Sequence, residues 1–180
     1  IQDMVKALEE SGVKGVRAAD PNKWSKGMAL DAVDVFGERN RDDDESDFSS
    51  MGKEGDQFNL VGYSYGGLQA AQGAIDHADN GGKVDNLVLI GTPVSAEFLE
   101  KLKKHPNISK VEIIDLGEHG DPIRAGMSTG ELVKGLPKLG TDFYADYDGT
   151  NRGHFYYSGD SEESRLRRRS LAKRLRELGI

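Results

Sequence analysis

The residues whose types and spacing best suit chemistry lie in the segment 62–66, Gly-Tyr-Ser-Tyr-Gly, which fits the pattern G-x-S-x-G. An apolar run typical of a buried strand precedes this segment, and apolar residues at helical spacing follow it. A sharp turn between strand and helix exposes the serine hydroxyl at the helix N-terminus, where amides and the helix dipole stabilise developing negative charge. Gly62 and Gly66 let the neighbouring backbones approach closely. The pattern predicts that Ser64 is a nucleophile, and a structural glycine-serine turn is the alternative.

A serine hydroxyl becomes a good nucleophile only when a base accepts its proton, and that base needs an acid to orient it. In an open parallel sheet these groups come from loops at the carboxyl ends of later strands. Asp121 follows the apolar stretch 111–116, and His154 follows the aromatic stretch 143–147. The chain order Ser64, Asp121, His154 is the order that accompanies a nucleophile on such a turn. We therefore predict acyl transfer with these residues as nucleophile, acid and base.

Three other histidines compete for the role of base. His119 is too close in sequence to Asp121 to face it across a site, and His77 falls within the helix that follows the serine. His105 ends a helix, where a cation complements the helix dipole. His154 has the loop position and the chain order that the role requires, so it is favoured.

Two further acidic features have alternative interpretations. Asp115 lies at the end of the same stretch that precedes Asp121 and is the alternative acid, although its apolar neighbours place it within the strand. A polar loop over 41–51 contains clustered carboxylates, whose spacing matches no EF-hand calcium loop. A solvated loop is the favoured interpretation, and we predict no metal site.

The chain has 180 residues, of which 36% are hydrophobic and 31% charged, and this composition suits one soluble domain with a core. Its net charge of −7 argues against a general nucleic-acid binder, so we expect no nucleic acid among its partners. No apolar run approaches a membrane span, and no signal-peptide pattern opens the chain. Because the first residue is Ile1 rather than Met, we expect a fragment or a processed product.

Apolar periodicity predicts strands that alternate with helices, in one domain over residues 1–180. The expected strands cover 13–19, 58–61, 87–90, 111–116 and 143–147. The expected helices cover 1–8, 29–36, 68–78, 98–102 and the tail from 161, while 126–139 is partly helical and broken by Gly and Pro. This alternation implies an α/β fold with a mainly parallel sheet and helices on both faces.

Four segments resemble the second half of an α/β-hydrolase, specifically its lipase-like members: FNLVGYSYGG at 58–67, NLVLIGTPVS at 86–95, IIDLGEHGDPI at 113–123 and GTNRGHFYY at 149–157. The resemblance covers about residues 13–180. It implies a serine hydrolase that cleaves carboxylic esters of lipids or small molecules through an acyl-enzyme, with no metal or organic cofactor. It also implies that the N–H of Tyr65, the residue after the nucleophile, donates to the oxyanion.

The chain departs from this family near its start, because a strand that supplies a second oxyanion donor is missing before the serine strand. A sheet that lacks a central strand exposes unpaired edges, so we expect an upstream segment or another chain to fill the gap. The HFYY segment and the basic helix after it are also similar to lipase-like domains of secreted bacterial toxins, such as Rhs-type and type VI secretion effectors. That similarity implies a secreted effector with an immunity or carrier protein as its partner.

The tail helix and the aromatic residues have two interpretations each. The helix carries cations that suit peripheral contact with a membrane surface, at Arg165, Arg167, Arg168, Arg169, Lys173, Arg174 and Arg176. We favour a structural role for it, in which an apolar stripe docks the helix on the sheet through Leu166, Leu171, Leu175 and Leu178. Aromatic residues would line an acyl pocket, although strands are rich in them: Phe143, Tyr144, Tyr147, Phe155, Tyr156 and Tyr157.

Two other functions remain open, one within enzymes and one from another class. A peptidase, a thioesterase or an acyltransferase would use the same fold and the same triad, because a fold does not fix a substrate. A hydrolase-like domain without activity would serve as a binding module. Intact Ser64, Asp121 and His154 argue against the binding module, whereas the missing strand argues for it.

Overall fold

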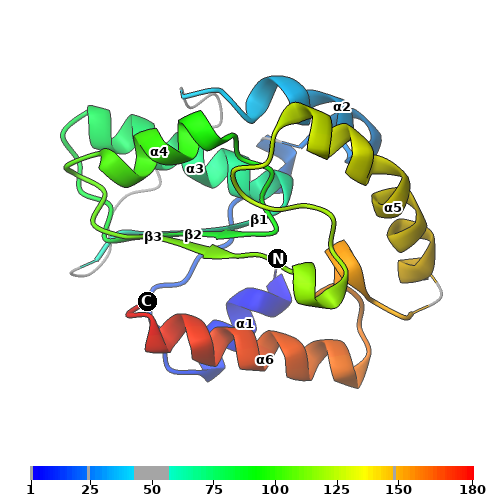
Figure 1. Cartoon of the computed structure of the whole chain (residues 1–180). Helices are drawn as coiled ribbons and strands as arrows, with labels where there is room; N and C mark the ends of the chain where they lie inside the picture. Colours follow the sequence, from blue (N-terminus) through cyan, green and yellow to red (C-terminus); the bar gives the residue numbers. More distant parts are fainter. Residues whose placement is uncertain (1, 24, 43–56, 148) are drawn as a thin grey trace.

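A small parallel sheet lies between two layers of helices (Figure 1). The structure, a computed structural model, describes residues 2–23, 25–42, 57–147 and 149–180. Its helices are α1 (Gln2–Glu10), α2 (Met28–Glu38), α3 (Tyr65–Asp79), α4 (Ala96–Lys104), α5 (Thr129–Tyr147) and α6 (Glu162–Glu177). Its strands are β1 (Asn59–Tyr63), β2 (Asn86–Ile90) and β3 (Val111–Ile114). Short 3₁₀ helices are η1 (Pro21–Lys23), η3 (Gly117–His119) and η4 (Gly153–Phe155).

The sheet has the strand order β1-β2-β3, and both neighbouring pairs are parallel. α3 connects β1 to β2, and α4 connects β2 to β3. Tyr63 pairs with Ile90, and Ile90 pairs with Ile114, so the carboxyl ends of the strands meet at one edge. A hydrogen bond from the Ser64 N–H to the Ile90 carbonyl, 2.9 Å long, continues the ladder one residue beyond β1. The predicted α/β class is therefore confirmed, with fewer strands among the described residues than were predicted.

Alternate residues of β2 face the two helical layers. Leu87 and Leu89 lie in a core with residues of α3 and α4, whereas Val88 and Ile90 lie in a second core with residues of α1 and α6. All four side chains are buried, because β2 is the central strand and is covered on both faces.

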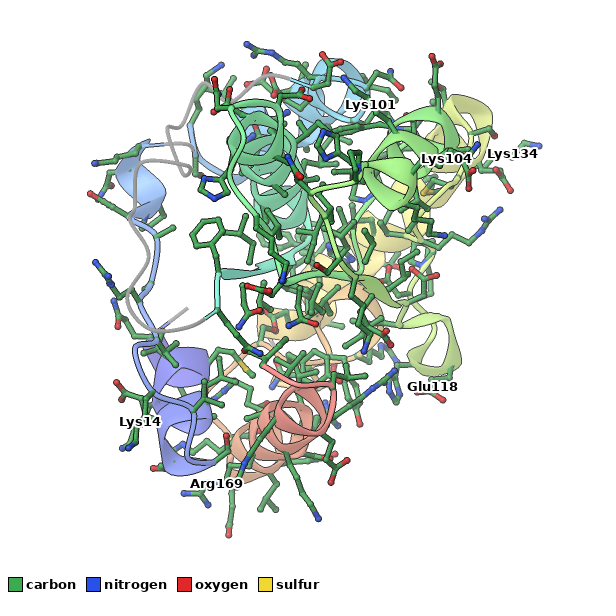
Figure 2. The ribbon with its side chains drawn as sticks, turned by 90° about the vertical axis from the view of Figure 1, so that its left-hand side faces the viewer. Lys14, Lys101, Lys104, Glu118, Lys134 and Arg169 are labelled. Atoms are coloured by element: carbon green, nitrogen blue, oxygen red, sulfur yellow. The ribbon has the colours of Figure 1, made fainter. Side chains whose placement is uncertain are left out.

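Figures 1 and 2 show how the helices are arranged around the sheet. α3 and α4 cover one face, and α1 and α6 cover the other. The labelled side chains of Lys104 on α4 and Arg169 on α6 lie on the outer surfaces of these two layers (Figure 2). α2 and α5 lie side by side, and a third core joins Val35 and Phe36 of α2 to Leu132 of α5.

Two of the predicted strands are wrong. Residues 13–19 form no strand: Val13 and Val16 pack against the core of α1 and α6, and the left-handed φ of 72° at Gly15 interrupts any extended run. Residues 143–147 are the last turns of α5, which continues through Pro137. The aromatic residues suggested a strand by composition, but buried residues of α5 recur at helical spacing through this stretch: Leu132, Gly135, Asp142 and Ala145.

The predicted apolar stripe of α6 is correct in its second half only. Leu171 and Leu175 are buried, and Leu178 packs against the same core. Leu166 is 56% exposed, because it lies off the i, i+4, i+7 row that these leucines define. Ser164 and Arg168 continue that row toward the N-terminus and are buried in its place.

β1 is the edge strand of the described sheet, because it pairs with β2 alone among the described residues. A cavity of about 670 Å³ lies along its other edge, between β1, α1 and residues 13–19. Its lining includes the apolar side chains of Met4, Leu8, Val16, Leu60 and Val61. The filling of this place by an upstream segment or another chain stays a prediction.

Most of the predicted acidic loop, residues 43–51, lies outside the described residues. Asp42, at its start, accepts a hydrogen bond of 2.5 Å from Lys101 Nζ on α4. Within the described ranges, no cluster of three or more His, Asp or Glu side chains is placed to hold a metal ion.

Candidate active site

Ser64 occupies the turn between β1 and α3, where it is the N-cap residue of the helix. Its φ of 54° and ψ of −127° lie where residues with a side chain are strained. The turn is this tight because glycines remove atoms that would collide: a Cβ on Gly62 would lie 2.5 Å from the Gly66 carbonyl oxygen. A Cβ on Gly67 would lie 1.9 Å from Thr92 Oγ1. The strand, turn and helix predicted around Ser64 are therefore confirmed, and Gly67 is a further close contact that the pattern did not indicate.

The structure brings the three predicted site residues together. His154 Nε2 lies 2.6 Å from Ser64 Oγ, and His154 Nδ1 lies 2.8 Å from Asp121 Oδ2. His154 and Asp121 are buried, while Ser64 is partly exposed. A carboxylate accepts only, so Asp121 selects the tautomer with the proton on Nδ1. Nε2 is then the acceptor that faces the serine hydroxyl.

The acid is fixed by its own loop. Asp121 Oδ1 accepts a hydrogen bond of 2.8 Å from the Ile123 N–H, so one carboxylate oxygen holds the loop and the other holds the histidine. The Asp121 N–H donates to the Leu116 carbonyl at 3.1 Å, which closes the turn around η3 at the end of β3. This position after β3 is the one predicted from the sequence.

The base reaches the site by a different route from the one predicted. His154 lies in η4, which follows α5 and a short loop rather than a strand. Asn151 in that loop is buried, has a left-handed φ of 39°, and donates from Nδ2 to Ser164 Oγ of α6 at 3.0 Å. No strand of the described sheet follows β3, so a strand cannot position His154. Its loop is held by α5, which precedes it, and by α6, which follows it.

Aromatic side chains surround the imidazole. The Tyr63 ring stacks on His154 with centroids 5.4 Å apart, and Phe155 meets it edge-on at 5.5 Å. Burial, together with the nearby Asp121 carboxylate, raises the pKa of Tyr63 well above its usual value, so its phenol is neutral. Gly91, with a φ of 49°, lies close to both Asp121 and His154: a Cβ there would lie 3.1 Å from Asp121 Oδ2 and 3.6 Å from the His154 ring. These contacts leave His154 little freedom to rotate.

The alternative acid does not reach the histidine. Asp115 is exposed, and its Oδ1 accepts a hydrogen bond of 3.0 Å from the Ala125 N–H, which ties two parts of the loop after β3 together. Although the residue is exposed, nearby protein atoms remove part of the carboxyl's hydration, and this desolvation raises its pKa. Asp115 therefore has a structural partner, and Asp121 holds the place beside His154.

The three competing histidines each make contacts elsewhere. The His77 ring packs against Phe58 with centroids 4.4 Å apart, and His105 Nε2 lies 3.1 Å from Asp79 Oδ1. His119 stacks on Tyr156 with centroids 3.6 Å apart. His154 is the histidine that meets both Ser64 and Asp121.

Tyr65, the predicted oxyanion donor, is the first residue of α3. First-turn amides of a helix have no acceptor within the helix, and they carry the positive end of its dipole. The role of the Tyr65 N–H as an oxyanion donor stays a prediction.

The predicted acyl-pocket residues lie in different surroundings. Phe155 lies against His154, and Phe143 packs against Phe155 with centroids 5.8 Å apart. Tyr144 is 74% exposed, Tyr156 stacks on His119, and Tyr157 lines the cavity beside β1. The side chain of Tyr147 lies outside the described part of the structure.

Comparisons with protein-family models, with curated proteins and with solved structures gave no match. None of the described helices is long and apolar enough to cross a membrane.

Proposed function

We propose that Ser64, His154 and Asp121 form a catalytic triad that hydrolyses carboxylic esters. The observation that carries this proposal is the hydrogen-bonded chain from Ser64 Oγ through the imidazole to Asp121, with steps of 2.6 and 2.8 Å. The N-cap position of Ser64 supports it, because a hydroxyl at this turn stands next to amides that stabilise an oxyanion.

The reaction has two halves. His154 Nε2 accepts the Ser64 hydroxyl proton while Oγ attacks the ester carbonyl carbon, and Asp121 stabilises the imidazolium that forms. The Tyr65 N–H donates to the tetrahedral oxyanion, and His154 returns the proton to the leaving alcohol oxygen. His154 then takes a proton from water, whose oxygen attacks the acyl carbonyl carbon. The bond from that carbon to Ser64 Oγ breaks, Oγ receives the proton from His154, and the carboxylic acid leaves.

A lipase-like α/β-hydrolase is the form of this activity that we propose. The parallel order of β1, β2 and β3 and the crossover helices between them are compatible with that fold. Rings beside the base, Phe155 and Phe143, suit an apolar acyl group rather than a charged substrate. A lipid or small-molecule ester is therefore the proposed substrate.

Labelling with a fluorophosphonate probe tests the nucleophile. We expect the probe to label the protein at Ser64, identified by peptide mass, and to leave Ser64→Ala unlabelled. Ser109→Ala is the matched control, because Ser109 is exposed and takes no part in the site. A folded wild-type protein that resists labelling would favour the binding module instead.

A panel of p-nitrophenyl esters of increasing chain length, beside phospholipid vesicles, tests the substrate class. Turnover that rises with acyl length supports a lipase-like enzyme. Turnover of thioesters or peptides in preference to oxygen esters would assign the triad to another kind of serine hydrolase.

A further inference from the structure

Three planar groups stack on one another near the candidate triad: the His119 imidazole, the Tyr156 ring and the Arg167 guanidinium. The His119 and Tyr156 rings lie 3.6 Å apart at 4°, and Arg167 Cζ lies 4.1 Å from the centre of the Tyr156 ring. Two groups so close to one ring centre cannot share a face, so Tyr156 lies between the imidazole and the guanidinium. The stack joins three elements: His119 belongs to η3, Tyr156 directly follows η4, and Arg167 belongs to α6.

This stack, His119–Tyr156–Arg167, adjoins both partners of the triad hydrogen bond. His119 precedes Asp121 by two residues, and Tyr156 follows His154 by two residues. The contact between the two rings therefore fixes the acid loop against the base loop beside the Asp121–His154 hydrogen bond.

Arg167 also holds the backbone of the base loop. Its Nη1 donates to the Asn151 carbonyl at 2.5 Å and to the Tyr156 carbonyl at 3.0 Å. These carbonyls bracket His154, three residues before it and two after it. The Arg167 side chain is only 16% exposed, and Nη2 pairs with Glu163 one helical turn earlier.

We propose that Arg167 is a positioning residue that sets the distances from His154 to Ser64 and to Asp121, acting through the Asn151 and Tyr156 carbonyls and through the stack. Its effect on turnover rests on the proposed function, whereas its effect on the Asp121–His154 hydrogen bond does not. An arginine suits this task because its planar guanidinium lies flat on a ring while the N–H groups at its edge donate to several acceptors, whereas a lysine ammonium has no planar face to stack.

The neighbouring Arg169 provides a matched control on the same helix. Its side chain is 61% exposed, points away from the sheet (Figure 2), and pairs only with Glu10 of α1 among the described residues. Surface pairs of this kind contribute little to stability. A role for α6 cations as general surface charge predicts similar effects at both positions, whereas our proposal predicts an effect at Arg167 alone.

The experiment compares the full-length wild type with Arg167→Met, Arg167→Lys and Arg169→Ala. One readout is the low-field proton resonance of His154 Nδ1–H, assigned by its loss in His154→Gln. The other is kcat and KM for p-nitrophenyl butyrate, with the thermal midpoint measured alongside. We expect Arg167→Met to shift or broaden the resonance and to lower kcat by about 10- to 100-fold with KM unchanged, as a misplaced base does. Arg167→Lys should recover part of the loss, and Arg169→Ala should match the wild type.

Each outcome decides the proposal. An Arg167→Met protein with a lower thermal midpoint but with the wild-type resonance and kcat would show a merely structural role and overturn it. If Arg167→Met does not fold, His119→Ala tests the stack from its other end, and His119→Phe should restore both readouts because it restores the ring. A wild type with the resonance but without ester turnover would remove the proposed function, and the resonance comparison would still decide the positioning role.

Discussion

The two sides of the candidate site are held by different kinds of contact. On the Ser64 side, the packing is so close that a Cβ on Gly62 would collide with the backbone of Gly66 and Gly67, and a Cβ on Gly67 would collide with the Thr92 side chain. On the His154 side, polar side chains from α6 hold a loop by hydrogen bonds, with Ser164 accepting from Asn151 and Arg167 donating to carbonyls. The packing around Ser64 has no room for an added atom. The hydrogen bonds that hold the His154 loop can be removed one at a time.

This difference predicts two patterns of failure. A change on the serine side should act sharply on stability, because packed backbone has no room to relax. A change on the histidine side should act mainly on catalysis and in graded steps, because each hydrogen bond contributes only part of the orientation.

The largest expected effect comes from the reacting groups themselves. Ser64→Ala and His154→Ala should each lower ester kcat by about 10⁴- to 10⁶-fold, and the double variant should lose little more, since triad members act as a unit. Steady-state kinetics measures the loss, and circular dichroism checks the fold. Inactivation by His119→Ala comparable to that by His154→Ala would assign the base to the wrong residue.

Replacing the acid is expected to be nearly as severe. Asp121→Asn should lower kcat by about 10⁴-fold, because an amide that donates to Nδ1 selects the wrong tautomer of His154. Asp115→Asn is the matched control and should change kcat less than about threefold, since Asp115 contacts the Ala125 N–H instead. Equal losses in the two variants would contradict the assignment of Asp121.

A smaller effect, on stability, tests the close packing at the serine. Gly67→Ala should lower the free energy of unfolding by about 1–3 kcal/mol, because the new Cβ meets Thr92 Oγ1. Urea denaturation measures the change. Thr92→Ala should recover part of it in the double variant, since it removes the two nearest atoms. Additive effects of the two substitutions would show that the contact is not the cause.

The smallest expected effect is an increase in the free energy of unfolding, opposite in sign to that of Gly67→Ala. Ser64→Gly should raise the free energy of unfolding by about 1 kcal/mol, because glycine adopts the φ of 54° without strain. Ser109→Gly, at an exposed residue outside the left-handed region, should lower it slightly. A destabilised Ser64→Gly protein would mean that the turn holds no strain.

The contrast also explains what the sequence predicted and what it did not. The serine turn depends on local spacing, so β1, Ser64, α3 and the flanking glycines could be expected from a dozen residues. β2 and β3 were likewise predicted, because buried parallel strands are short apolar runs.

The histidine side depends on contacts between distant residues. Chain order placed His154 in the site, but the expected strand before it is part of α5, and α6 buries Ser164 and Arg168 where Leu166 was expected. A buried arginine or serine on a helix does not stand out in a hydrophobicity pattern. The contacts of Arg167 could not be predicted either, because a carbonyl acceptor has no sequence signature.

The contacts that α6 makes with the His154 loop have a consequence for the order of folding during synthesis. The chain is synthesised from its N-terminus, so the turn at Ser64 is made long before α6. Arg167 of α6 donates to the Asn151 carbonyl in the loop that carries His154. Before α6 has been synthesised, the residues around Ser64 are already present, but the loop that carries His154 lacks its contacts with Arg167. If the proposed function holds, ester hydrolysis therefore requires α6 to be folded, and the turn at Ser64 alone does not suffice.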